Sequence, residues 1–209
     1  MNIKKIDFSI LGDTSTKNTC LVFIHGWGGN KNSFKKVAGS FAIKNSVWLL
    51  PQAPYPLDGE NRYSWTYEKS PGKYERDEPV QMMLSFLDEQ VFSRFDSKDV
   101  FIFGFSQGAL VCYELLKVLD KPVAGFFPIS GFIADQNITI KRIHNAQINT
   151  PIVIGHGLND DVVLFHESEL ALELLKNETN NVILESYKGG HKIGYSYIKK
   201  VKDLIERMH

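Results

Sequence analysis

The feature that most constrains the fold is the alternation of short apolar runs with helical patterns along most of the chain. The runs are rich in Val, Ile and Phe and are continuously apolar, which is typical of strands buried on both faces of a parallel sheet. They occupy residues 20–26, 46–52, 99–105, 122–130, 151–157 and 181–187, and a weaker run at 3–11 predicts an edge strand.

Helical spacing of apolar residues fills the stretches between these runs. Val80, Met83, Leu84 and Leu87 hold i, i+3, i+4, i+7 spacing, and Pro79 suits a first helical turn. Strands that alternate with helices indicate an α/β fold, with a mostly parallel central sheet and helices on both faces. The site of such a sheet forms beyond the carboxyl ends of its strands. The predicted helices span 79–95, 107–119, 165–177 and 192–208.

Size and composition predict a single domain, residues 1–209, because the chain fits one core and carries no repeat or Gly/Ser linker. The formal net charge of zero argues against a nucleic-acid partner. No apolar run reaches about 18 residues, so no integral membrane association is expected. The two cysteines, Cys20 and Cys112, lie in apolar patterns and predict free thiols in a cytoplasmic protein. Oligomeric state is left open, with a homodimer as one option.

The residues Gly104-Phe105-Ser106-Gln107-Gly108 join the run 99–105 to the helix 107–119. The pattern G-x-S-x-G is weak evidence by itself, but its place between a strand and a helix is that of a nucleophile elbow. Glycines on either side remove Cβ atoms that would collide when a serine adopts a strained backbone. The sequence therefore predicts Ser106 as a nucleophile. The alternative is a tight turn that merely needs room.

A serine hydroxyl is a weak nucleophile until a base takes its proton. His191, in the Gly-rich turn after the run 181–187, can serve as that base and later protonate the leaving group. A carboxylate after the run 151–157 would orient it, and Asp160 and Asp161 compete for this role because spacing does not choose between them. The chain order Ser, Asp, His is that of α/β-hydrolases. The alternatives are a surface or capping histidine and a solvated aspartate pair.

The loop HGWGGNKNSF follows the run 20–26 and is rich in glycine. Such a loop can bring a backbone N–H close to a carbonyl oxygen, and Trp27 is the predicted donor, with the N–H of Gln107 completing an oxyanion hole. His25 precedes the turn and is expected to fix the loop by hydrogen bonding. A phosphate-binding turn is the alternative, but no Lys-Ser/Thr closes the loop.

Five segments in this order resemble the phospholipase/carboxylesterase family of α/β-hydrolases, which includes acyl-protein thioesterases. They are FIHGWGG, LPQAPYP…GENRYSW, GFSQGAL, GHGLNDDVV and GGHKIG, and the resemblance covers roughly residues 20–195. It implies a compact, lid-poor α/β-hydrolase fold, no cofactor, and a serine esterase that acts on acyl esters or thioesters.

Carried over residue by residue, the resemblance implies that Ser106 is the nucleophile, His191 the base, and Trp27 and Gln107 the oxyanion donors. The family spacing H-G-x-x-D matches His156, Gly157 and Asp160, so the resemblance selects Asp160 over its neighbour.

The sequence departs from the family pattern at three places. Asp161 stands where proline is common, Ala109 replaces a glycine after the elbow, and YSWTYEKS only partly matches a Trp-Phe-Asp segment, with Trp65 as the matching tryptophan.

Trp65, Phe105 and Leu164 are expected to line an apolar substrate pocket, with ordinary core packing as the alternative reading. The segments HGWGG, GFSQG, GHGLNDD and GGH at the strand ends contain no Arg or Lys, so a strongly anionic acyl group is not expected. The histidines lack ligand spacing such as H-x-x-x-H, so no metal is expected.

Together these patterns predict a hydrolase that cleaves carboxylic esters or thioesters, small or lipid, through an acyl-Ser106 intermediate. The alternatives are a peptidase-like or lactone-opening hydrolase on the same fold and a non-catalytic ligand-binding relative.

Overall fold

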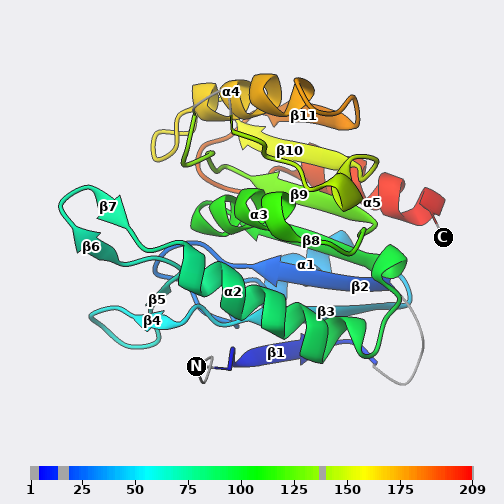
Figure 1. Cartoon of the computed structure of the whole chain (residues 1–209). Coiled ribbons are helices and arrows are strands. Elements are labelled where there is room, and N and C mark those ends of the chain that lie inside the picture. The colour runs from blue at the N-terminus through cyan, green and yellow to red at the C-terminus, as the bar shows by residue number, and fades with distance from the viewer. Residues whose placement is uncertain (1–4, 14–18, 137–139, 209) are drawn as a thin grey trace.

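One central sheet of seven strands organises the molecule, in the order β1-β3-β2-β8-β9-β10-β11 (Figure 1). The computed structural model describes residues 5–13, 19–136 and 140–208. All neighbouring strands pair in parallel except β1, which runs antiparallel to β3 at one edge. The strands are β1 (Phe8–Leu11), β2 (Thr19–Ile24), β3 (Ser46–Pro51), β8 (Val100–Phe105), β9 (Gly125–Ile129), β10 (Ile152–Gly157) and β11 (Val182–Tyr187).

Each apolar run of the sequence forms a strand of this sheet, which confirms the predicted α/β class. The weak run at 3–11 supplies the antiparallel edge strand β1, although residues 3 and 4 lie outside the described part of the chain. The predicted helices are α2 (Asp77–Phe86), which continues as a π-helical turn over Leu87–Phe92, α3 (Gln107–Val118), α4 (Phe165–Lys176) and α5 (Tyr195–Met208).

Helix α1 (Lys35–Phe41) was not predicted. It has only seven residues, of which Ala38 and Phe41 are buried, so it offers too little periodicity to read. The other elements are two short 3-10 helices, Ser97–Asp99 and Asn145–Gln147.

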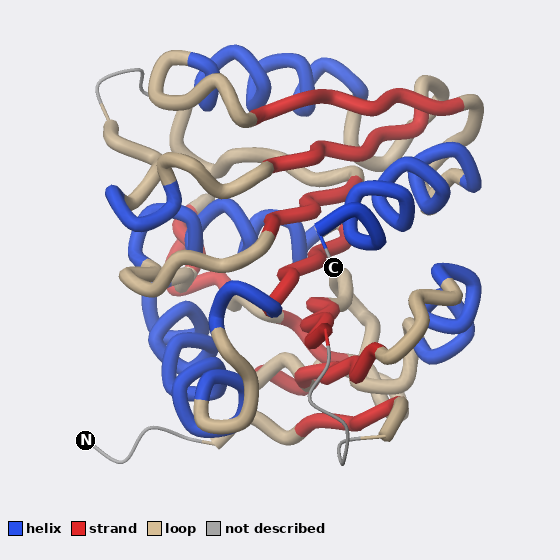
Figure 2. Tube along the Cα trace, turned by 90° about the vertical axis from the view of Figure 1, so that its right-hand side faces the viewer, coloured by secondary structure: helices blue, strands red, loops and turns tan. Residues whose placement is uncertain are grey.

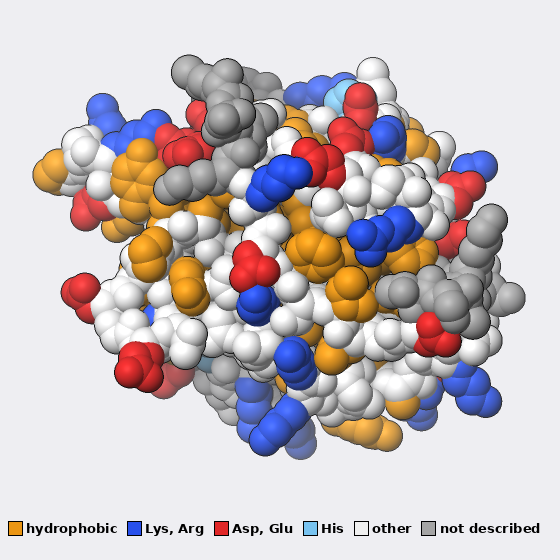
Figure 3. Space-filling model, turned by 90° about the horizontal axis from the view of Figure 1, so that it is seen from below, with side chains coloured by type: hydrophobic (Ala, Val, Ile, Leu, Met, Phe, Trp, Pro, Cys, Tyr) orange, Lys and Arg blue, Asp and Glu red, His pale blue; other side chains and the backbone are white. Residues whose placement is uncertain are grey.

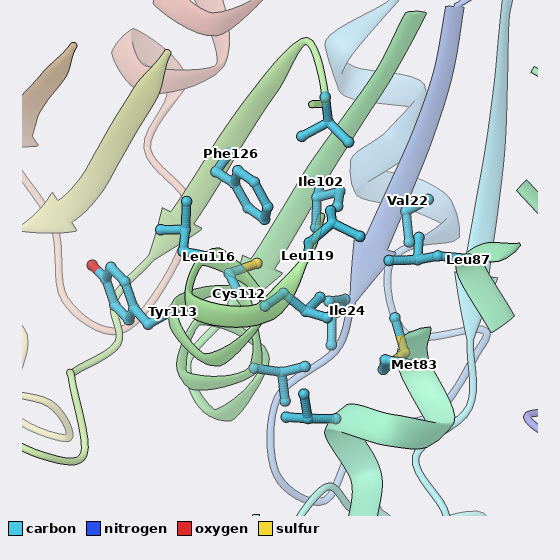
Figure 4. Packing of buried hydrophobic residues seen from close by; sticks show 14 of the residues in the cluster. Val22, Ile24, Met83, Leu87, Ile102, Cys112, Tyr113, Leu116, Leu119 and Phe126 are labelled. Atoms are coloured by element: carbon cyan, nitrogen blue, oxygen red, sulfur yellow. The ribbon is translucent and has the colours of Figure 1, made fainter. Parts of the chain in front are cut away.

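Helices cover both faces of the sheet (Figure 2). One face packs against α2, α3 and α4, where Met83, Cys112 and Leu116 belong to the same buried cluster as Val22 and Ile102 (Figure 4). The opposite face packs against α1 and α5. Successive strand residues point to opposite faces, which is why the buried runs are apolar at every position.

Two short hairpins lie outside the central sheet. The first pairs β4 (Tyr55–Pro56) with β5 (Tyr63–Ser64), and the second pairs β6 (Glu68–Ser70) with β7 (Lys73–Tyr74). The β6–β7 hairpin extends away from the layered body (Figure 1). Its turn is Pro71-Gly72, and Gly72 has φ +75°, a conformation that favours glycine. This hairpin was not predicted, although the Pro-Gly dipeptide is a turn signal.

The surface carries charges of both signs. On the face seen from below, Lys and Arg side chains alternate with Asp and Glu among apolar side chains (Figure 3). Within the described residues, no helix has the length and apolar character needed to cross a bilayer.

Candidate active site

Ser106 occupies the sharp turn between β8 and α3, with φ +55° and ψ −116°. A non-glycine residue rarely adopts a positive φ, because its Cβ crowds the backbone, and such strain persists only where the surroundings impose it. The Ser106 N–H donates to the carbonyl of Ile129 in β9 at 2.8 Å, which anchors the turn to the sheet. The strained serine therefore stands at the carboxyl end of the strand and at the N-terminus of a twelve-residue helix.

Two glycines of the G-x-S-x-G motif allow the elements around this turn to pack closely. A Cβ at Gly104 would collide with the carbonyl of Gly108 and with Cys112 Sγ, and a Cβ at Gly108 would collide with the carbonyl of Ile24. Helix α3 thus approaches both β8 and β2 at distances that no side chain permits. The glycines make room for the helix, and within the pentapeptide Ser106 is the residue with a positive φ.

Asp160 and His191 come together at the same edge of the sheet. His191 Nδ1 lies 2.8 Å from Asp160 Oδ2, and the Asp160 side chain is fully buried. Asp161 is exposed. The ring of Phe105, the residue before Ser106, lies 4.8 Å from the His191 ring between centroids, which links the elbow to the histidine turn.

The Asp160 carboxyl is held as an anion by its hydrogen bonds. Burial opposes ionisation, but hydrogen bonds from His191 and from the N–H groups of Val162 and Val163 outweigh it and lower the pKa of Asp160. Both valine amides donate to Oδ1 at 3.0 Å, which leaves Oδ2 for the histidine. A buried carboxylate in this position fixes the histidine tautomer and stabilises the imidazolium.

A second imidazole, His156, packs against the same carboxylate. Its Nε2 lies 2.9 Å from the carbonyl of Val163 and 3.3 Å from Asp160 Oδ2. A carbonyl can only accept, so Nε2 carries the proton and Nδ1 accepts from the Ser168 hydroxyl at 2.6 Å. His156 is fully buried and positions the loop that bears Asp160. The sequence marked His156 only through the H-G-x-x-D spacing.

Two backbone amides have no acceptor in the part of the protein that the structure describes, that of Trp27 in the loop after β2 and that of Gln107 at the start of α3. Among the described residues, no hydrogen bond joins the N–H of Trp27 or of Gln107 to another group. The next loop amide, Gly28 N–H, donates to Tyr63 at 2.9 Å and fixes the loop. Free amides in a loop and at a helix N-terminus can donate to a developing oxyanion.

His25 fixes this loop, as the sequence indicated. Its Nδ1 donates to the carbonyl of Gly26 at 2.8 Å, and its Nε2 accepts from the N–H of Ala53 at 3.1 Å. Burial lowers the pKa of His25 to about 4, so the ring is neutral near pH 7.

The side chain of Gln107 has a role that the sequence did not reveal. Its Oε1 accepts from the N–H of Trp65 at 2.9 Å, and its Nε2 donates to Ser64 Oγ and Thr66 Oγ1, each at 2.9 Å. These bonds tie the start of α3 to the segment that leads into the β6–β7 hairpin. Gln107 therefore holds this segment in place next to the elbow.

A cleft of about 550 Å³ opens beside Ser106. The strand-end loops, α3 and the β6–β7 hairpin all contribute to its wall. The lining residues are Trp27, Thr66, Gly72, Lys73, Tyr74, Arg76, Ser106, Gln107, Leu110, Phe132 and Ala134. The hairpin was not predicted from the sequence, so its residues in this wall were not expected either.

The sequence predicted three residues of the substrate pocket. None of Trp65, Phe105 and Leu164 is among the residues that line this cleft. The Trp65 ring is fully buried in the core. Its indole N–H donates to the carbonyl of His25 at 2.8 Å, which helps to hold the loop after β2 in place. Phe105 stacks near His191, and Leu164 is 64% exposed at the start of α4.

Metal ligands do not gather at this site. Across the part of the chain that the structure describes, no three His, Cys, Asp or Glu side chains form a cluster that could hold a metal ion.

The strand order and the strained serine at a strand-to-helix turn define the class of protein. A mostly parallel sheet with crossovers on both faces, and with Ser, Asp and His in that chain order after β8, β10 and β11, is the architecture of an α/β-hydrolase.

Comparison with known families narrows this class. A model of the family described as phospholipase/carboxylesterase matches residues 7–209. The chain therefore belongs to the phospholipase/carboxylesterase family, as its motifs indicated.

Two relatives illustrate the range of that family. Carboxylesterase SOBER1 of Arabidopsis thaliana is 26% identical over 205 residues, which cover 90% of each chain. An acyl-protein thioesterase 1 from Debaryomyces hansenii is 29% identical over 191 residues, which cover 82% of each chain.

Solved structures share the fold over nearly the whole chain. The crystal structure of SOBER1 superposes with a TM-score of 0.77 at 26% identity, over 91% of this chain and 99% of that one. The crystal structure of esterase PE8 gives a TM-score of 0.81 at 22% identity, over 99% and 100% of the two chains, and supports the fold alone.

Proposed function

We propose that this chain hydrolyses carboxylic esters or thioesters through an acyl-enzyme intermediate on Ser106. The observation that carries the proposal is the buried Asp160–His191 pair, with its 2.8 Å contact, at the sheet edge where the strained Ser106 stands. Relatives named carboxylesterase and acyl-protein thioesterase support both kinds of acyl bond. Small-molecule and lipid acyl compounds are the proposed substrates.

In the first half-reaction the Ser106 oxygen attacks the acyl carbon while His191 takes the hydroxyl proton through Nε2. Negative charge then builds on the carbonyl oxygen, where the N–H groups of Trp27 and Gln107 donate to it. Asp160 stabilises the imidazolium through Nδ1. When the tetrahedral intermediate collapses, the bond to the alcohol or thiol breaks and His191 donates its proton to that leaving group.

In the second half-reaction water replaces the leaving group. His191 removes a proton from the water, the resulting hydroxide attacks the acyl-Ser106 carbon, and the serine oxygen leaves with the proton from His191. The products are the free acid and the restored serine. No external oxidant or metal takes part in these steps.

The proposed location is the cytoplasm. Cys20 and Cys112 are buried free thiols whose pKa values burial raises, which suits inert thiols in a reducing compartment. A homodimer stays a prediction.

The test is steady-state hydrolysis of esters and thioesters of graded acyl length by the wild type and by Ser106→Ala. The serine variant is expected to lose at least about 10³-fold in kcat with an unchanged circular dichroism spectrum. Near-normal turnover by Ser106→Ala would contradict the proposal. Peptide and lactone substrates run alongside distinguish the alternative hydrolases on this fold.

Neighbouring aspartates provide a matched pair for the orienting carboxylate. Asp160→Asn is expected to lower kcat by about 10⁴-fold, since the amide favours the wrong histidine tautomer. The exposed Asp161→Asn is expected to retain turnover within about two-fold. Equal, mild losses in both variants would mean that neither residue orients His191.

A further inference from the structure

The cleft beside Ser106 has two charged residues in its wall, and both are cations. Lys73 lies on β7 and Arg76 immediately precedes α2. Among the described residues that line the cleft, none is acidic. The positive charge in the described wall of the cleft therefore comes from the hairpin, through Lys73, and from Arg76 two residues after it.

Lys73 is exposed on the projecting hairpin. In the described part of the chain, no hydrogen bond or ion pair joins its ammonium group to an acidic side chain. A lysine on the wall of a substrate cleft without a protein counter-ion is available to a ligand anion.

Arg76 is only weakly engaged by protein. Its Nη1 lies 3.7 Å from Glu114 Oε1, while Lys117 lies closer to the same carboxylate, at 2.8 and 2.9 Å. One carboxylate therefore serves two cations and leaves a net positive charge. A guanidinium that is about a third exposed keeps N–H donors for a further acceptor.

The acidic residues nearest in the sequence are mostly engaged with other groups. Glu75 is buried in an ion pair with Lys69 and accepts from the N–H of Glu78. The Glu78 carboxylate accepts from the Tyr55 hydroxyl at 2.7 Å, and Glu68 accepts from the N–H of Gly72 at 2.7 Å. Asp77 lies in the first turn of α2 and does not line the cleft.

The remaining wall is apolar and suits the carbon chain of a substrate. Leu110 and Ala134 offer aliphatic surface, and Trp27, Tyr74 and Phe132 offer aromatic surface. The Trp27 ring carries the Arg62 guanidinium at 5.2 Å from its centroid, which adds a third cation near the rim.

We propose that the cleft selects acyl esters or thioesters that carry an anionic group, a carboxylate or a phosphate, which Lys73 and Arg76 bind. This proposal rests on the proposed hydrolase function and adds a substrate class to it. Charge-assisted hydrogen bonds to a lysine and an arginine would orient the anion. The apolar wall would contact the carbon chain, and Ser106 would reach the acyl carbon.

The test compares matched substrate pairs that differ only in one charge. The first pair is the nitrophenyl monoester of a six-carbon dicarboxylic acid and the same compound with its distal carboxylate methylated. The second pair is the butanoyl ester of glycerol phosphate and that of glycerol. The first pair places the anion on the acyl side and the second on the leaving-group side.

For at least one pair the wild type is expected to give a kcat/KM ratio, anionic over neutral, of about 10 or more. Lys73→Gln is expected to lower that ratio about tenfold, and Lys73→Arg to keep most of it. Because the interaction is electrostatic and partly exposed, the ratio should fall as salt rises. Lys199→Gln, an exposed lysine of α5, is the control variant and should leave the ratio unchanged.

A ratio near one for both pairs, or a ratio that Lys73→Gln does not change, would overturn the substrate class while ester hydrolysis stands. Absence of Ser106-dependent hydrolysis of every ester would overturn the proposed function and the substrate class together.

Discussion

At the scale of single residues, Ser106 has a backbone conformation that costs stability, and the same conformation places its hydroxyl for the proposed chemistry. The backbone there is held at φ +55°, although serine favours negative φ. Its N–H bond to Ile129 and the close approach of α3 hold the turn against that preference. The strained turn places Ser106 beyond the end of β8, at the N-terminus of α3, and next in the chain to Phe105, whose ring lies 4.8 Å from the His191 ring between centroids.

Removal of the Ser106 side chain therefore has two separable effects. Ser106→Gly and Ser106→Ala both remove the proposed nucleophile and are expected to be inactive. Glycine adopts this backbone without the strain that a Cβ causes, so Ser106→Gly should be more stable than Ser106→Ala by about 1 kcal/mol in free energy of unfolding. Urea denaturation of the two variants measures the difference, and equal stabilities would mean that the turn is not strained.

At the scale of elements, the contact between β8 and α3 sets the position of the site. Gly104 on the strand and Gly108 on the helix bring the two backbones together, and the helix start carries the Gln107 amide. The side chain of Gln107 then binds the segment 64–66, which leads into the β6–β7 hairpin. One helix terminus thus aligns the elbow with a wall of the cleft.

A methyl group at Gly104 tests this contact. Its Cβ would collide with the Gly108 carbonyl, which is backbone and cannot move aside alone, so Gly104→Ala should lower the free energy of unfolding by about 3 kcal/mol. Gly39 in helix α1 has open space around it, and Gly39→Ala should raise that free energy by about 0.5–1 kcal/mol. Denaturant midpoints that shift equally in both variants would contradict the close-packing argument.

The sequence predicted the long elements and the residues at the strand ends, but it did not predict the short elements. The long strands could be predicted because burial on both faces makes them apolar throughout, and the long helices could be predicted because their apolar residues recur at helical spacing. Candidate residues at the strand ends were readable because parallel strands end at one edge. Helix α1 and the hairpins are too short to show periodicity, so the cleft wall with Lys73 and Arg76 was missed. The expectation that Trp65 faces the substrate was drawn from a partial motif, and burial in the core depends on contacts that no local pattern encodes.

At the scale of the whole molecule, a buried neutral histidine couples folding to pH. Burial lowers the pKa of His25 from 6.5 to about 4. Between these values the unfolded chain binds a proton that the folded chain does not, so stability falls as pH decreases. The contribution of His25 is fully present above pH 6.5 and is lost as pH falls toward 4.

The expected loss of unfolding free energy from His25 between pH 7 and pH 4 is about 3 kcal/mol. His25→Gln removes the titrating group, so its stability should fall less steeply over the same range even though the variant is less stable at pH 7. Urea unfolding at pH 7, 5.5 and 4 for both proteins measures this. Parallel stability profiles for wild type and variant would contradict a neutral buried His25.

The central claim is that Ser106 is an activated nucleophile, and covalent labelling tests it most directly. A fluorophosphonate probe incubated with the folded protein, followed by intact and peptide mass spectrometry, reports which residue reacts. One label per chain is expected on Ser106, with none in Ser106→Ala and much slower labelling in Asp160→Asn. Absence of labelling in the wild type, or equal labelling of Ser106→Ala, would contradict the account.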